Sequence, residues 1–369
     1  MSVIIFILIL AVLIIVHEYG HFIVAKMWGI RVDEFGLGYP PRAKVLFKRK
    51  GTLFTLNWIP FGGFVKIFGE DPEEAKKEKT ENNEEVNKGV ALTEKSKFAQ
   101  ATVMFAGPLF NFIFAWIVIL AILFIGLPTS KSAENQNYIT DEKTIITEVM
   151  ENSPASEAGV LVGDVVKTIS FKGVAYNSLQ DLDFSNLSNS KDKIVSVSFQ
   201  RGEEILIKNI PVGDFKLNEK PAIGVGLQEV GIYKPPFFTA ILESFKLTGS
   251  MIYQITIGLG TLIVDSFKGQ ADVSNLTGPV GIVALVGDAS VLGVAYLLMF
   301  VALISVNLGV INLVPFPALD GGRILFLIIE KIKGSPISTK VSNTLNSVGF
   351  VILIGLMIFI TFRDIIKLF

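Results

Sequence analysis

The sequence predicts a polytopic α-helical membrane protein with four transmembrane helices, a membrane-associated β-hairpin sheet and one extracytoplasmic domain of α+β structure. Composition is the first reason. Half of the 369 residues are hydrophobic, and the charged residues gather in blocks between apolar runs, which is rare in a soluble protein of this length. Length is the second reason, because an apolar run of about 20 residues can cross a bilayer core of about 30 Å.

Charge and cysteine content narrow the function. Lys and Arg together number 33 and Asp and Glu 34, so the chain has no excess of positive charge, and we expect no nucleic-acid partner. The chain has no cysteine, which excludes disulfides and thiolate metal ligands.

Four apolar runs are expected to span the membrane. They fall in segments 1–28, 98–127, 291–322 and 323–369, the last of which begins with a cytoplasmic loop. The apolar run of this last segment, Val348–Thr361, reaches spanning length with its polar flanks. The first run has no basic residues before it and no small-residue cleavage site after it, so we expect a retained helix rather than a signal peptide.

Two other kinds of segment lie between the first two runs. Segment 29–69 has short runs of Val, Phe, Leu and Thr, separated by Gly and Pro around the turn KRKG, which is typical of β-hairpins. It is too apolar for a fully solvated sheet, so we expect it to lean on the membrane. Segment 70–97 is rich in Glu and Lys and is expected to be a flexible linker or a helix.

Segment 128–232 is expected to fold as a separate domain outside the membrane. It has a strand that ends at Ser153–Pro154, a short helix, a tight turn at Gly163–Asp164 and a second strand, which together resemble the bacterial PDZ pattern. The alternating stretch Lys193–Val212 is typical of a hairpin that turns at Arg201–Gly202. An unspecified small β domain is the alternative interpretation.

The only two histidines of the chain lie four residues apart in the first run, within His17-Glu18-Tyr19-Gly20-His21. On a helix, residues i and i+4 share a face about 5–6 Å apart, so both imidazoles can bind one Zn²⁺. Glu18 lies beside them, where it can accept a proton from the attacking water without binding the metal. This is the H-E-x-x-H pattern. Ionisable groups at membrane depth are costly, which favours a functional site over buried core histidines.

A catalytic zinc requires a third protein ligand and an open coordination position. Both histidines are already used and cysteine is absent, so we expect a carboxylate. Asp320 is the candidate, because Pro315 and Pro317 break the end of the third run and bring Asp320 to membrane depth. The following Gly321–Gly322 permit close backbone approach. The alternative is that Asp320 only caps the next helix.

Together these motifs resemble the site-2 protease family. They are H-E-x-x-H in the first run, N-x-x-P-x-P-x-L-D-G from Asn312, and the PDZ-like domain between them. Three further stretches match: GGFVKIFGEDP (Gly62–Pro72), FAGPLFN (Phe105–Asn111) and LTGPVGI (Leu276–Ile282). The likeness is strongest to bacterial intramembrane metalloproteases of the regulator-of-sigma-E type, although well-known members carry two tandem PDZ domains and this chain has room for one.

The resemblance implies a zinc-dependent protease whose metal ligands are His17, His21 and Asp320. It implies that Glu18 is the catalytic base. It also implies that amides on the third run, Asn307 and Asn312, help to hold unwound substrate, and that the β-hairpin pairs with the substrate as an added strand. The implied reaction is regulated intramembrane proteolysis, with an anti-sigma factor or a signal-peptide remnant as the substrate class.

The expected partners are transmembrane protein substrates and membrane lipid. A substrate helix must unwind before cleavage because its internal hydrogen bonds shield every peptide bond, and a hairpin edge can bind the freed groups by β-augmentation. Gly62 and Gly63 lie in the hairpin and are expected to bind substrate, with a simple β-turn as an equal alternative. The PDZ-like domain is expected to contact the substrate C-terminus or to filter substrates by size.

Lys and Arg near membrane ends predict the orientation. They follow the first run in Lys26, Arg31 and RAKVLFKRK, and they follow the third run in the loop after Arg323. Both regions are therefore expected in the cytoplasm. The N-terminus and the PDZ-like domain are then extracytoplasmic, the active site lies toward the cytoplasmic side, and the protein is a multi-pass protein of the bacterial plasma (inner) membrane.

A fifth apolar run, Phe237–Phe267, belongs to segment 233–290, which we expect to be interfacial and amphipathic. If this run crossed the membrane, the third span would reverse direction. Asp320 would then lie on the order of 20 Å from the histidines. We therefore expect four spans, with Phe237–Phe267 along the outer interface and its charged side chains toward water.

Two other classes of function remain as alternatives. The first is a catalytically inactive, PDZ-bearing membrane scaffold, against which the intact motif argues because a structural zinc site has no use for Glu18. The second is a metal transporter, against which the single metal site and the lack of an inverted repeat argue.

Overall fold

The computed structural model describes residues 2–70, 90–131, 136–171, 174–176, 194–202, 204–212, 215–217, 220–270 and 277–366. Most of the expected linker, residues 71–89, lies outside the described residues. The chain divides into two compact units, which we treat separately. The helical unit consists of Met1–Ile122 and Phe238–Phe369, and the β unit is Leu123–Phe237.

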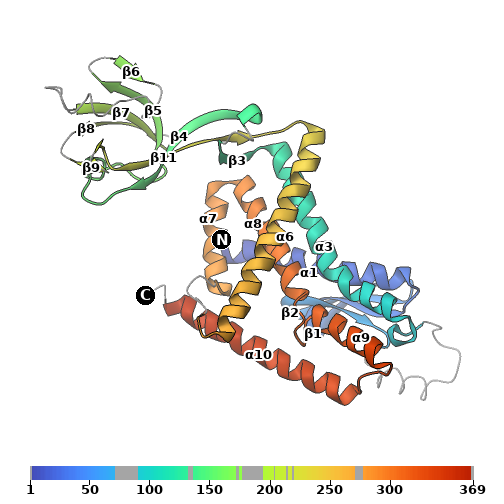
Figure 1. Ribbon diagram of the computed structural model, residues 1–369. Helices are drawn as coiled ribbons and strands as arrows, with labels where there is room; N and C mark the ends of the chain where they lie inside the picture. The colour runs from blue at the N-terminus through green and yellow to red at the C-terminus, as the bar shows by residue number, and fades with distance from the viewer. Residues whose placement is uncertain are drawn as a thin grey trace. The chain divides into compact units, whose positions relative to one another are not determined.

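Long apolar helices make up most of the helical unit (Figure 1). Within the described residues, five are long and apolar enough to cross a membrane: α1 (Ser2–Met27), α3 (Lys97–Ile125), α6 (Phe237–Phe267), α8 (Val294–Asn312) and α10 (Thr339–Ile366). Three shorter helices accompany them: η1 (Leu92–Glu94), α7 (Pro279–Leu292) and α9 (Asp320–Lys333). The chain is therefore a multi-pass membrane protein. The described residues contain five helices of spanning length, one more than the four spans that the sequence predicted.

The helix α3 is the most enclosed of the five, with 39% of its most apolar stretch buried, against 6% for α6 and α10. It stays helical through Pro108, which membrane helices tolerate because neighbouring groups satisfy the freed backbone. The backbones of α1 and α3 touch, since a Cβ at Gly20 would lie 2.4 Å from the Ala106 carbonyl oxygen. Small residues permit such close approach between membrane helices.

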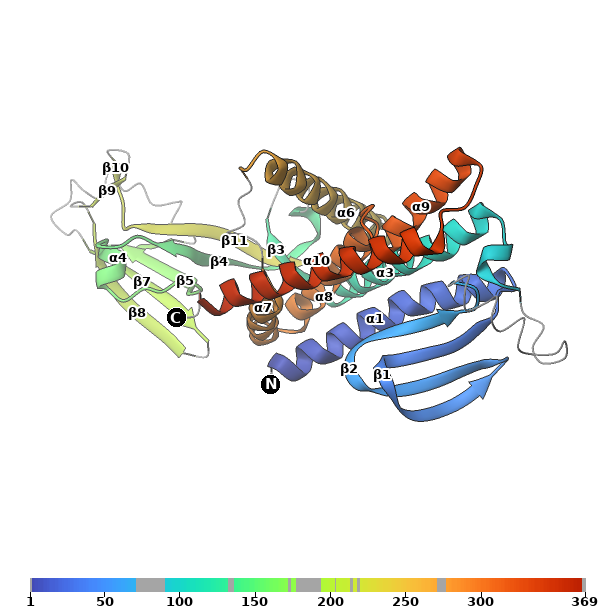
Figure 2. The ribbon, with the colours of Figure 1, turned by 90° about the horizontal axis from the view of Figure 1, so that it is seen from below.

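The helix α6 combines a small polar face with a long exposed apolar surface. Its buried residues are Ala240, Ser244 and Thr248, one turn apart, and Trp116 of α3 donates a hydrogen bond to the Ser244 hydroxyl at 3.0 Å. Figures 1 and 2 show α6 running obliquely to α1 and α10. Its length and composition suit a span, so its location at the interface stays a prediction.

Segment 29–69 forms a long, folded-back hairpin beside α1 (Figure 2). Its strands are β1 (Val32–Arg49) and β2 (Thr52–Ile67). Lys50 and Gly51 make the turn at positive φ, 47° and 83°. The first half of β2 pairs with both halves of β1, since Leu53 lies opposite Glu34 and also opposite Lys48.

Among the described residues, the folded-back pairing creates a sheet of four stretches, of which the first and the last are its edges. Their order is 63–67, 32–37, 52–57 and 42–49. The stretch 63–67 is the edge that contacts α1, where a Cβ at Gly63 would lie 3.1 Å from the Ile14 side chain and 3.5 Å from Glu18. This edge stretch therefore lies directly beside the H-E-x-x-H helix.

The β unit contains a seven-stranded antiparallel sheet with the order β3-β11-β4-β5-β7-β8, and β6 pairs with β5. The strands are β3 (Leu127–Ser130), β4 (Ile139–Val149), β5 (Val165–Phe171), β6 (Val174–Tyr176), β7 (Ile194–Arg201), β8 (Glu204–Pro211) and β11 (Val225–Tyr233). The remaining elements are the ribbon β9 (Lys216–Leu217) and β10 (Lys220–Pro221), the helix α4 (Pro154–Glu157) and the turn η2 (Gln136–Tyr138). The hairpin β7–β8 turns where the sequence predicted, with Arg201 opposite Glu204.

The core of the β unit follows the alternation of its strands. On β7, Val195, Val197 and Phe199 are buried, whereas Ile194 points outward. The Arg201 guanidinium binds the buried Asp164 through two contacts of 2.7 Å, which holds the pKa of that carboxyl below its ordinary value. The ion pair thus closes the Gly-Asp turn against β7. The structure supports an extra β domain here, and its PDZ identity stays a prediction.

Candidate metal centre and active site

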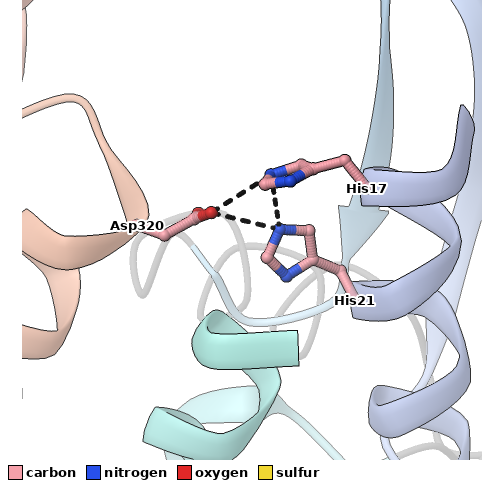
Figure 3. A group of neighbouring side chains, drawn as sticks. All are labelled: His17, His21 and Asp320. Atoms are coloured by element: carbon pink, nitrogen blue, oxygen red, sulfur yellow. Dashed lines mark hydrogen bonds and ion pairs between the residues drawn. The ribbon is translucent and has the colours of Figure 1, made fainter. Parts of the chain in front are cut away.

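Three side chains that could bind a metal ion meet where α1 faces the start of α9 (Figure 3). His17 and His21 lie one turn apart on α1 and are 8% and 7% exposed. Asp320 begins α9, and its side chain is 17% exposed. In the described part of the chain, these residues are the one group of three or more His, Cys, Asp or Glu that could hold a metal ion.

The ligand atoms have the spacing that a tetrahedral zinc requires. The two Nε2 atoms are 3.2 Å apart, and Asp320 Oδ2 lies 3.1 Å from His17 Nε2 and 3.4 Å from His21 Nε2. Ligands at 2.0–2.1 Å from a tetrahedral Zn²⁺ lie about 3.3 Å from one another. Asp320 Oδ2 is buried and has no hydrogen-bond partner among the described residues, so a metal ion would satisfy it.

A break between α8 and α9 places Asp320 beside the two histidines. The chain turns back so tightly that a Cβ at Gly321 would lie 2.3 Å from the Leu313 and Val314 carbonyl oxygens, and one at Gly322 would lie 2.2 Å from that of Phe316. These two glycines are therefore required for the close approach that the sequence predicted. The N-cap of α9 is Leu319, and the Asp320 carboxylate points at the histidines instead of capping the helix (Figure 3).

The helix α10 packs against this break between α8 and α9. Ala318 has a φ of 74°, which is unusual for a residue with a side chain. Its backbone N–H donates to Asn346 Oδ1 at 3.1 Å, and a Cβ at Gly349 would lie 2.6 Å from the Pro317 carbonyl oxygen. The sequence contained no local signal for Asn346, because its role depends on how α10 packs.

The helix α3 supports both histidines. The Val103 carbonyl accepts a hydrogen bond from His21 Nδ1 at 2.8 Å. The Asn111 amide lies 3.1 Å from His17 Nδ1. Between them, a Cβ at Gly107 would lie 2.3 Å from His21 Nε2 and 2.8 Å from His17 Cε1. Only glycine leaves room here for both imidazoles.

These α3 residues were not assigned from the sequence, although Gly107 and Asn111 lie in the stretch FAGPLFN. Their spacing of four residues was visible, but a spacing on one helix does not reveal what that helix faces. The packing of α3 on α1 gives them a partner.

A cavity of about 480 Å³ opens beside the metal-ligating group. Glu18 lines it together with Val65, Asn312, Gly62 and Gly63. Gly62 has a φ of 106°, and a Cβ there would collide with the Tyr39 ring at 2.3 Å. The cavity therefore brings together the edge of the hairpin, Glu18 and the carboxylate of Asp320.

Asn307 is the one expected site residue that does not line this cavity. Its Nδ2 donates a hydrogen bond to the Leu303 carbonyl of its own helix at 2.9 Å. All the other residues expected at the site line the cavity: His17, Glu18, His21, Gly62, Gly63, Asn312 and Asp320.

A helical membrane body with a buried two-His, one-carboxylate group next to a glutamate defines the class of membrane-embedded zinc metalloproteases. Comparison with known proteins agrees with this class. The model of peptidase family M50 matches residues 5–356. The chain therefore belongs to peptidase family M50, the site-2 protease family.

Individual relatives are similar over almost the whole chain. A protein of Clostridium perfringens that carries the provisional name of a zinc metalloprotease is 36% identical over 358 residues, covering 96% of this chain and 95% of that protein. The zinc metalloprotease RasP of Shouchella clausii is 30% identical over 440 residues, covering 99% and 98%. The regulator of sigma-W protease RasP of Bacillus subtilis is 28% identical over 438 residues, covering 100% and 99%.

The family settles the broad function. The protein is an intramembrane metalloprotease with Zn²⁺ as its cofactor. Full-length similarity to zinc metalloproteases does not fit the alternatives of an inactive scaffold or a metal transporter.

Proposed function

We propose that this protease cleaves a peptide bond within or beside the transmembrane segment of membrane-anchored proteins. One observation carries the proposal: the edge stretch of a β-sheet, a glutamate and a two-His, one-Asp group line the same cavity among apolar helices. A soluble peptide substrate would need no sheet edge at membrane depth. An unwound membrane segment would need one, because its freed backbone groups find no water there.

The ligand set is His17, His21 and Asp320. Zn²⁺ bound there supplies a Lewis acid that polarises the scissile carbonyl and makes water a stronger nucleophile. Glu18 accepts the proton of the attacking water and delivers it to the leaving amine. Glu18 lies beside His17 in sequence and lines the cavity, which is the position that this base requires.

The substrate is held by the edge stretch 63–67. One side of this stretch pairs with 32–37, and Gly63, Phe64 and Val65 line the cavity beside Glu18. A substrate in extended conformation can add to this edge as another strand. Gly62 and Gly63 keep the edge clear of side chains, and the Asn312 amide supplies a further hydrogen-bonding group. Asn307 bonds its own helix, and no contact supports the same assignment for it.

The substrate class that we propose is a membrane-anchored regulator such as an anti-sigma factor, or a signal-peptide remnant. The name of the Bacillus subtilis relative links that protein to sigma-W regulation. The β unit, as an extracytoplasmic PDZ domain, would contact the substrate C-terminus or exclude substrates with bulky ectodomains. The protein would lie in the bacterial plasma (inner) membrane, with its N-terminus outside and its active site toward the cytoplasm.

Two substitutions test the assigned roles. Glu18→Gln should abolish cleavage of a membrane-anchored reporter while zinc stays near one ion per chain, because Gln cannot act as a base. Asp320→Ala should lose both zinc and cleavage, because it removes a ligand. Cleavage at the wild-type rate by Glu18→Gln would exclude Glu18 as the base, and unchanged zinc in Asp320→Ala would remove Asp320 from the metal centre.

The proposed four-span topology is tested by labelling. The chain has no cysteine, so single cysteines can be placed at Pro235 and at Gln270, on either side of α6. If α6 lies along the outer interface, a membrane-impermeant thiol reagent added from outside should label both positions. Labelling at position 235 with protection at 270 would show that α6 crosses the membrane and that the chain has five spans.

A further inference from the structure

Asn111 is a fully buried polar residue that the proposed reaction leaves without a role. It is 0% exposed and lies on α3 two turns after Val103, the residue that binds His21. Its amide group is 3.1 Å from His17 Nδ1, and its Oδ1 has no hydrogen-bond partner among the described residues. A buried acceptor without a partner destabilises the fold, so this amide is expected to have a use.

The backbone of Asn111 is held independently of its side chain. Ser305 of α8 donates a hydrogen bond from its hydroxyl to the Asn111 carbonyl oxygen at 2.8 Å, and this contact is buried. The side-chain amide can therefore rotate by half a turn, which exchanges Oδ1 and Nδ2, while the helix stays in place. The two orientations have nearly the same shape and differ in which atom faces His17.

The orientation of the amide decides which nitrogen of His17 carries the proton. A histidine that binds a metal through Nε2 keeps its proton on Nδ1 and needs an acceptor there. His21 has such an acceptor permanently, because the Val103 carbonyl can only accept. His17 has Asn111 instead, which accepts through Oδ1 or donates through Nδ2. When Asn111 Nδ2 points toward His17 Nδ1, the imidazole proton lies on His17 Nε2, which is 3.1 Å from Asp320 Oδ2. The Nε2 lone pair is then not available to bind a metal ion.

We propose that Asn111 is a positioning residue for the metal centre: its Oδ1 accepts the Nδ1–H of His17 and thereby presents the Nε2 lone pair to zinc. This inference rests on the proposed role of His17 as a ligand.

Two substitutions at position 111 separate this role from simple packing. Asn111→Asp keeps the shape and can only accept, so zinc should bind at least as tightly as in the wild type. Asn111→Leu keeps the volume and has no acceptor, so the zinc dissociation constant should rise about 10–100-fold, the range for loss of an outer partner of a metal ligand. Ser305→Ala is the matched control, since it removes the neighbouring buried hydrogen bond without touching the amide, and its zinc affinity should match the wild type.

Zinc affinity is measured on the full chain in detergent by competition with a chelator, and the unfolding midpoint of each metal-free variant is measured alongside. A tenfold or greater loss in Asn111→Leu, with Asn111→Asp retained and metal-free midpoints equal, supports the proposal. Zinc binding by Asn111→Leu within twofold of the wild type overturns it. Equal losses in the Leu and Asp variants, or a loss accompanied by a lower metal-free midpoint, overturn it as well, because the residue would then act through packing.

A spectroscopic signature provides a second readout that packing would not produce. The chain has two histidines, so ¹⁵N-histidine labelling of the zinc-saturated protein should give two Nδ1–H signals. The signal of His17 should shift between the wild type, Asn111→Asp and Asn111→Leu, whereas that of His21 should stay in place. An unchanged His17 signal in Asn111→Leu overturns the inference. A His17→Ala variant that still binds zinc would instead overturn the proposed ligand set.

Discussion

Among the described residues, the helical unit buries more polar side chains than the β unit does. The β unit has an apolar core, which consists of Ile146, Ala155, Val160, Val166, Ile169, Val195, Val197, Phe199, Ile210, Val212 and Ile223. In its described part, the helical unit also buries polar side chains, among them His17, His21, Gln100, Asn111 and Ser305, and it leaves much of the apolar surface of α6 and α10 exposed.

The difference shows that the surrounding solvent determines which kind of buried contact stabilises the fold. In water, removing apolar surface from solvent stabilises a domain by about 25 cal/mol per Å². In lipid, the outer surface can stay apolar at no cost, so helices associate through close packing of small residues and through hydrogen bonds. The interior of the helical unit is thereby available for a polar site. Three predictions probe this comparison, from the largest expected effect to the smallest.

Gly107→Ala should have the largest effect, because the added methyl group would lie 2.3 Å from His21 Nε2. The imidazoles must move, and a displacement of about 1 Å can reduce a reaction rate by about 100-fold. We expect loss of zinc from the purified protein and a comparable loss of cleavage. The matched control is Gly258→Ala on α6, where no other described part of the chain comes within 4 Å of the new Cβ beyond the adjacent residues and backbone of the same helix. This control should keep its zinc, and equal zinc loss in both variants would show that the α3 contact is unimportant.

Lysine substitutions at Val351 and Ile205 test whether the two positions face different solvents, lipid for α10 and water for β8. Both are 68% exposed, the first on α10 and the second on β8. Val351→Lys should reduce the amount of protein in the membrane, because a lysine at the centre of a membrane helix costs about 2.5–3.5 kcal/mol. Ile205→Lys should change stability by no more than about 0.5 kcal/mol. The fraction that resists carbonate extraction measures the effect. If both variants behave alike, α10 does not face lipid at position 351.

Arg201→Ala should have the smallest effect, confined to the β unit. Asp164 is 1% exposed, and loss of its partner should destabilise this unit, without loss of zinc. Hydrogen exchange of β7 amides in the full chain measures the change.

The effect should also depend on pH. The hydrogen bond from Arg201 lowers the pKa of Asp164 in the folded state. The contribution of the pair is therefore complete above the unfolded pKa of about 3.9 and is lost as the pH falls through the folded pKa. The difference between wild type and variant should shrink in acid. A difference that is the same at pH 7 and in strong acid would contradict an electrostatic origin.

The sequence predicted the local elements well, because each depends on neighbouring residues. Apolar runs predicted α1, α3, α8 and α10, and Gly and Pro punctuation predicted the β1–β2 hairpin. The run Phe237–Phe267 was the ambiguous element, and α6 has these same bounds. Hydropathy determines that such a helix is apolar. It does not determine whether the helix crosses a membrane, since a tilted interfacial helix and a spanning helix can share one composition.

By itself, the sequence determined that two imidazoles lie on one helix face, since a spacing of four residues matches one helical turn. It also placed Asp320 after a chain break, because Pro315 and Pro317 cannot continue a helix. Only the tertiary structure decided that Asp320 Oδ2 lies 3.1 Å from His17 Nε2, and that α3 supplies Gly107 and Asn111 behind the histidines. These contacts join residues far apart in sequence. Their distances depend on how whole helices pack, and local spacing carries no information about that packing.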